Sequence, residues 1–78
     1  MTVADLTRDQ LNFLALHVRR VVFMWRWVFR ESMLIADAGS RFATIARAEL
    51  DDLISRGLMI RGSGADVYPT PDGKALLA

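Results

Sequence analysis

Hydrophobic residues recur every three or four positions in the first part of the chain, which is typical of an amphipathic helix. The stripe comprises Leu11, Leu14, Val18, Val21 and Val22. Just before it, Thr7-Arg8-Asp9-Gln10 has the form of a capping box, in which Thr7 accepts a hydrogen bond from the backbone and Gln10 reaches back. We therefore expect a helix that begins at Arg8.

No glycine or proline interrupts residues 11–38, so the end of this first helix is not marked. The segment could form one long helix, or two helices joined by a tight bend near residues 19–24. The β-branched and aromatic run at residues 21–23 leaves room for a short strand there. We expect two helices, because a straight helix of about 30 residues suits a coiled coil better than a compact domain.

Glycines punctuate the second half of the chain. Gly39 can end a helix and Ser40 can cap the next one, which predicts a helix over residues 41–56 that Gly57 closes. The apolar side of this helix would comprise Phe42, Ile45, Ala46, Leu50 and Leu53. Residues 58–61 and 67–68 then read as a short hairpin, and Thr70-Pro71 as the start of a closing helix.

Two helices separated by the Gly39 turn would form a helix-turn-helix. Residues 31–38 would be its first helix and residues 41–56 its second, with Leu34 and Ile45 packed between them. With the hairpin as a wing, the pattern predicts a single winged helix-turn-helix domain over residues 1–78. This fold is mostly α with a small β-hairpin.

The C-terminal part carries the markers of a known family. Arg56-Gly57-Leu58, a hairpin and the segment from Tyr68 through Thr70-Pro71-Asp72-Gly73 to Leu77 resemble the tail of bacterial winged-helix regulators of the multiple-antibiotic-resistance and phenolic-acid-regulator type. The resemblance covers roughly residues 31–78. It implies a regulator of transcription that binds double-stranded DNA as a homodimer. The wing is short, however, and the long dimerisation helices of that family are absent.

Four residues are candidates for DNA contact under this interpretation. In this family type the first half of the recognition helix enters the major groove, so Thr44 and Arg47 would contact bases. Arg41 and Arg61 would contact phosphates. The arginines could equally be surface residues in contact with solvent, and an acidic stretch at residues 49–52 would repel phosphate. Arg19, Arg26 and Arg30 would form a further basic stripe if their segment were one helix, although a solvated face explains them as well.

Composition makes a second interpretation necessary. The chain has 78 residues, of which 53% are hydrophobic, and a net charge of only +1, whereas dedicated nucleic-acid binders usually carry a stronger basic bias. Four aromatic residues, Phe23, Trp25, Trp27 and Phe29, cannot all face one small core if they lie on a helix. We expect them to form a homodimer or partner interface. The alternative function is therefore a protein-binding module, such as a small or phage-type inhibitor or adaptor, without DNA binding.

Other classes of function have little support in the sequence. The single histidine, His17, has no second histidine or acidic pair near it, so we expect no metal site, no cofactor and no enzymatic activity. The glycines at residues 62–64 lack the Lys-Ser/Thr of a phosphate-binding loop. The chain has no cysteine, no signal-peptide pattern and no apolar run of about 20 residues, so we expect a cytoplasmic protein with no membrane contact.

Overall fold

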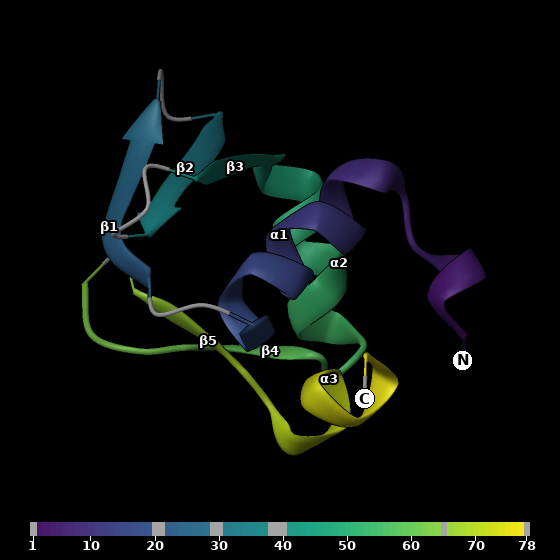
Figure 1. Ribbon diagram of the computed structural model, residues 1–78. Helices are drawn as coiled ribbons and strands as arrows, with labels where there is room; N and C mark the ends of the chain where they lie inside the picture. Colours follow the sequence, from purple (N-terminus) through teal and green to yellow (C-terminus); the bar gives the residue numbers. More distant parts are fainter. Residues whose placement is uncertain (1, 20–21, 29–30, 38–40, 65, 78) are drawn as a thin grey trace.

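The described part of the chain folds into three α-helices, a three-stranded sheet and a two-stranded sheet (Figure 1). The structure is a computed structural model that describes residues 2–19, 22–28, 31–37, 41–64 and 66–77. In chain order the elements are a 3-10 turn η1 (Val3–Asp5), α1 (Arg8–Arg19), β1 (Val22–Val28), β2 (Ser32–Asp37), β3 (Phe42–Ala46), α2 (Arg47–Ser55), β4 (Met59–Arg61), β5 (Val67–Pro69) and α3 (Pro71–Leu76).

The start of α1 confirms the capping box predicted from the sequence. The Thr7 amide donates to Gln10 Oε1 at 3.0 Å, and the Gln10 amide donates to Thr7 Oγ1 at 3.2 Å. Both bonds satisfy backbone N–H groups that the first helical turn leaves without a partner. The helix therefore begins at Arg8, as expected.

The prediction of a second helix within residues 11–38 is wrong. Helix α1 ends at Arg19, and β1 begins at Val22, close to the place where the sequence left room for a strand. Residues 32–37 form β2 rather than the first helix of a helix-turn-helix. Strand β2 pairs with β1 on one side and β3 on the other, and its burial alternates as in a strand: Met33 and Ile35 are fully buried while Leu34 between them is partly exposed.

The second half of the predicted helix-turn-helix is also corrected. Residues 42–46 form β3, and the helix predicted from Arg41 begins only at Arg47. Strands β1, β2 and β3 pair in that order as an antiparallel meander. Ile45 lies opposite Met33 in this sheet, so it is buried by a neighbouring strand and not by a neighbouring helix. The fold is α+β, not mostly α.

The C-terminal elements follow the sequence closely. Gly57 has φ +76° directly after α2, the conformation expected of a glycine that ends a helix. Strands β4 and β5 pair as the predicted hairpin. Thr70 Oγ1 accepts a hydrogen bond from the Gly73 amide at 3.1 Å, and Pro71 is the first residue of α3. Local turn and cap chemistry therefore fixes this region.

One hydrophobic core joins all the layers. Helices α1 and α2 each contribute two side chains to this core, and the others come from β2, β3, β5 and the segment 58–59 that follows α2. The buried set is Phe13, Leu14, Met33, Ile35, Ile45, Leu50, Leu53, Leu58, Met59 and Val67. Figure 1 shows the meander beside α1 and α2, with the β4–β5 hairpin running below them to α3.

A buried glutamine ties α1 to α2. Gln10 is only 2% exposed, and its Nε2 donates to the Glu49 carbonyl oxygen at 3.0 Å and to Asp52 Oδ2 at 2.8 Å. The same side chain closes the capping box through Oε1. One residue therefore satisfies the start of α1 and fixes the position of α2 against it.

Candidate nucleic-acid interface

A groove of about 770 Å³ lies between α1 and β3, and we call it the α1–β3 groove. Helix α1 lines it with residues spaced three or four apart, which places them along one side of the helix. The lining residues are Asp9, Asn12, Ala15, Leu16 and Arg19 from α1, and Arg41, Phe42, Ala43 and Thr44 from the other wall. This volume falls within the range of roughly 300–1,000 Å³ that is usual for small-ligand sites.

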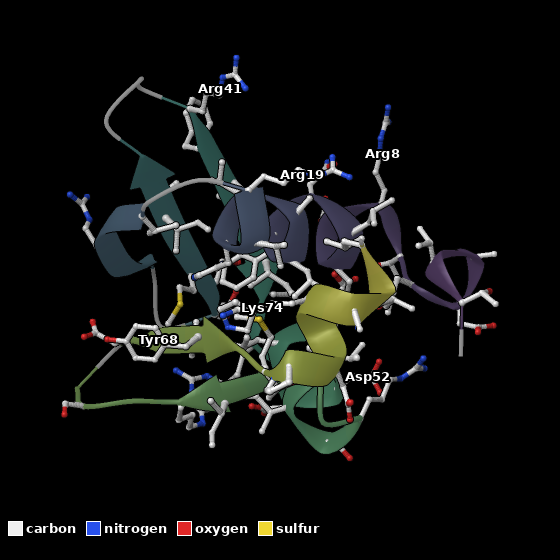
Figure 2. All side chains as sticks on the ribbon, turned by 60° about the horizontal axis from the view of Figure 1, so that its bottom comes forward. Arg8, Arg19, Arg41, Asp52, Tyr68 and Lys74 are labelled. Atoms are coloured by element: carbon white, nitrogen blue, oxygen red, sulfur yellow. The ribbon has the colours of Figure 1, made fainter. Side chains whose placement is uncertain are left out.

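Two arginines give the α1–β3 groove its charge. Arg19 comes from the last turn of α1 and Arg41 directly precedes β3. Within the part of the chain that the structure describes, Arg19 has no carboxylate at ion-pair distance. Figure 2 shows Arg8, Arg19 and Arg41 extending from the same side of the molecule, away from Asp52 and Tyr68. Among the described residues that line the groove, two carry a positive charge and Asp9 is the only one with a carboxylate.

Strand β3 adds an exposed aromatic ring to this wall. Phe42 is 71% exposed, although the sequence pattern had placed it on the buried side of a helix. Residues alternate along β3, so that Ile45 is buried whereas Phe42 and Thr44 both lie at exposed positions. The α1–β3 groove therefore combines arginines, a hydroxyl group and an aromatic ring.

The four predicted DNA-contact residues are divided between different surfaces. Arg41 and Thr44 line the α1–β3 groove, but Thr44 lies on a strand and not on a recognition helix. Arg47 is exposed at the first position of α2. Arg61 lies on β4, where its Nη2 donates to Asp51 Oδ1 at 2.8 Å. The structure brings Arg41 and Thr44 together and leaves Arg61 apart.

Helix α2 presents acidic groups where a recognition helix would present basic ones. Asp51 pairs with Arg61, and Asp52 pairs with Arg56 at 3.0 Å. The hydrogen bond from Gln10 lowers the pKa of the Asp52 carboxyl, and Arg56 lowers it further. The Asp52 carboxylate is therefore ionised at neutral pH, and its charge opposes the approach of phosphate to this helix.

The predicted aromatic interface falls on an outer strand. Phe23, Trp25 and Trp27 belong to β1, which pairs with β2 on one side and stands at the end of the strand order β1-β2-β3. Trp25 is the register partner of Ile35, and Trp27 that of Met33. Phe29, the fourth residue of the predicted interface, lies outside the described residues, as does Arg30 of the proposed basic stripe.

His17 is buried in α1. Its Nδ1 lies 3.0 Å from the Phe13 carbonyl oxygen and its ring packs on the Phe13 ring, with 4.7 Å between centroids. Burial lowers the pKa of the His17 imidazole, because the charged form loses hydration. Among the described residues no group of three or more histidine, cysteine, aspartate or glutamate side chains could hold a metal ion, and none of the described helices is long and apolar enough to cross a membrane.

Sequence reasoning missed Phe42 as a surface residue and treated Arg19 mainly as a solvated charge. The β-branched pair Thr44-Ile45 favours a strand, but the apolar and polar residues at 42–45 do not alternate, so the sequence carries no signal that Phe42 is exposed. No sequence signal pairs Arg19 with Arg41, because the meander brings them to one groove only after folding.

Comparisons with protein-family models, with curated proteins and with solved structures find no match to this chain.

Proposed function

We propose that this protein binds nucleic acid through the α1–β3 groove and acts in the cytoplasm as a small regulator. The observation that carries the proposal is the meeting of Arg19, Arg41 and the exposed Phe42 in one groove. Arginine binds phosphate through a planar set of donors, and aromatic rings stack on bases. Basic and aromatic side chains in one hollow can contact both the phosphates and the bases of a nucleic acid.

The sequence predicted a nucleic-acid partner, and we keep that partner. The contact surface that we propose is the α1–β3 groove instead of the predicted recognition helix. A winged-helix regulator would insert α2 into the major groove and place the β4–β5 hairpin beside it. The order of α2, β4 and β5 along the chain fits that arrangement. The ion pairs of Asp51 and Asp52 oppose it, because they present carboxylates on α2 and neutralise the nearby arginines. We therefore assign phosphate contact to the α1–β3 groove.

Fluorescence anisotropy with a labelled 20-mer, single-stranded and as a duplex, tests this proposal. We expect binding at about 50 mM salt that weakens steeply towards 200 mM, since each neutralised phosphate adds about −0.9 to the salt slope on duplex DNA. Replacing Arg19 by glutamine should reduce that slope by about one. The matched control is Arg61→Gln, which removes the same charge from the distant β4 strand and should change the slope little.

Two results would contradict the proposal. One is the absence of binding to either oligonucleotide at about 50 mM salt, where phosphate contact is strongest. The other is an equal loss of binding in Arg19→Gln and Arg61→Gln, which would show that only the net charge matters.

A protein-binding module is the second candidate, and the β4–β5 hairpin favours it. Ile60 and Tyr68 are register partners on this hairpin and are 57% and 44% exposed, respectively. Protein interfaces have an apolar centre and a polar rim. Here Ile60 and Tyr68 would form the centre, and the Arg61–Asp51 ion pair would lie at the rim. Capture of a stoichiometric protein from nuclease-treated lysate that is lost in Ile60→Ser, together with no oligonucleotide binding, would favour this function.

A further inference from the structure

We propose that the α1–β3 groove is selective for single-stranded nucleic acid and that Phe42 is the surface on which a base stacks. This inference rests on the proposed function and specifies its substrate. It goes beyond the sequence interpretation, which predicted a duplex in contact with a helix.

Phe42 is placed to contact a ligand and not the core. It is the first residue of β3 and is 71% exposed, whereas Phe13 and Ile45 are buried in the core. Its apolar ring therefore adds little to folding stability, since burial is the source of hydrophobic stabilisation. A planar ring at the wall of a basic groove offers a stacking surface to any of the four bases.

Single strands expose the chemical groups that this wall can bind. In an undistorted duplex the faces of the bases are covered by their neighbours, so that an aromatic side chain reaches only edges and phosphates unless it unstacks a base step. In a single strand the faces are accessible. Phe42 can therefore stack on a base only when the strand is unpaired or the base has left the stack.

The shape of the site agrees with this substrate. Direct readout of base edges in the major groove of a duplex needs an element that enters a groove about 12 Å wide. Here Arg19, Phe42 and Thr44 line a hollow of about 770 Å³ between a helix and a strand. A concave site of this size accepts a nucleotide that enters it, with the arginines beside the phosphates and the Thr44 hydroxyl available to a base edge.

Phe42 and Thr44 also lie on the same face of β3. They are two residues apart on β3 and both are exposed, so they lie on the same face of the strand about 7 Å apart. A base stacked on Phe42 would thus have a hydrogen-bonding hydroxyl within reach along the strand. The structure assigns stacking to Phe42, phosphate contact to Arg19 and Arg41, and edge contact to Thr44.

The test compares a labelled 15-mer of thymidine with a duplex of the same length for three proteins: wild type, Phe42→Leu and Phe42→Trp. Leucine keeps an apolar side chain but removes the ring, and tryptophan keeps the ring. We expect wild type to bind the single strand more tightly than the duplex. Phe42→Leu should weaken single-strand binding about 5- to 150-fold, the range for one stacked base, whereas Phe42→Trp should retain it.

A second readout reports stacking itself. With 2-aminopurine at the central position of the single strand, wild type and Phe42→Trp should quench the probe more than Phe42→Leu does at saturating protein. Because Phe42 is exposed, both variants should keep the circular dichroism spectrum and the melting temperature of wild type within a few degrees.

The outcomes separate this inference from the proposed function. If single strand and duplex bind equally and Phe42→Leu changes neither, while Arg19→Gln weakens both, the groove binds phosphate and the stacking inference is wrong. Equal competition by an acidic peptide of the same charge would also overturn it, because the groove would then be a general anion site. If neither oligonucleotide binds, both proposals fail.

Discussion

Replacing Gln10 by methionine tests the hydrogen-bonded tie between α1 and α2. The glutamine is 2% exposed and forms three side-chain hydrogen bonds, with the Thr7 amide, the Glu49 carbonyl oxygen and the Asp52 carboxylate. Methionine has a similar length and is apolar and flexible, so it fills the same space without forming these bonds. The substitution therefore removes polar contacts and leaves the packing volume largely unchanged.

The expected loss follows from the two bonds to backbone groups. Each contributes about 0.5–1.5 kcal/mol to the free energy of unfolding, which gives about 2 kcal/mol together. The bond to Asp52 adds little, because that carboxylate is exposed enough for water to replace the glutamine. For a domain of 60–100 residues, about 2 kcal/mol corresponds to a decrease in melting temperature of about 8–16 °C.

Urea unfolding followed by circular dichroism measures this loss directly. The matched control is Asn12→Met, an exposed position on the same helix, which should change the free energy of unfolding by less than about 0.5 kcal/mol. A Gln10→Met protein as stable as this control would refute the idea that the tie stabilises the fold. Gln10→Glu adds a sharper test, because it places a second carboxylate beside that of Asp52. Repulsion between the two charges should destabilise the fold more at pH 7 than at pH 4, where the new carboxylate is partly protonated.

Three further predictions concern other parts of the fold. Gly73→Ala should lower the free energy of unfolding by about 1–3 kcal/mol in urea melts, because the new Cβ would collide with the Leu58 carbonyl oxygen. Burial lowers the pKa of His17 in the folded protein, so the unfolded chain binds more protons. The free energy of unfolding should therefore be constant above about pH 6.5 and fall as the pH drops from there towards the folded pKa. His17→Asn should remove this dependence on pH. In sedimentation equilibrium the chain should be a homodimer joined through β1, with Trp25→Ser or Trp27→Ser shifting it towards monomer; a wild-type protein that stays monomeric at high micromolar concentration would contradict this.

Elements set by local chemistry could be predicted from the sequence. Thr7 and Gln10 close their box with groups within three residues, and Thr70 caps a helix that Pro71 begins. Gly57 takes its positive φ at the end of α2 for a local reason as well. In each case the physical cause lies within one turn of chain, so the sequence contains it in full.

The meander could not be predicted in this way. Residues 33–36 are four consecutive apolar residues that suit a buried strand or a buried helix equally. Strand β2 becomes a strand because β1 and β3 hydrogen-bond to it from both sides, and the sequence pattern does not record that pairing. The candidate site was missed for the same reason, since Arg19 and Phe42 meet only when β3 packs beside α1.

The tie from Gln10 to Glu49 also bears on how the chain reaches its fold. It joins residues 39 positions apart, and the whole meander lies inside the loop that it closes. Closing a flexible loop of that length costs about 3 kcal/mol of chain entropy, from (3/2)RT ln n. The antiparallel strands β1, β2 and β3 are neighbours in sequence and pair across short connections. Early pairing of these strands would shorten the loop before α1 and α2 meet, so mutations that weaken the meander should slow folding more than those that weaken the Gln10 tie.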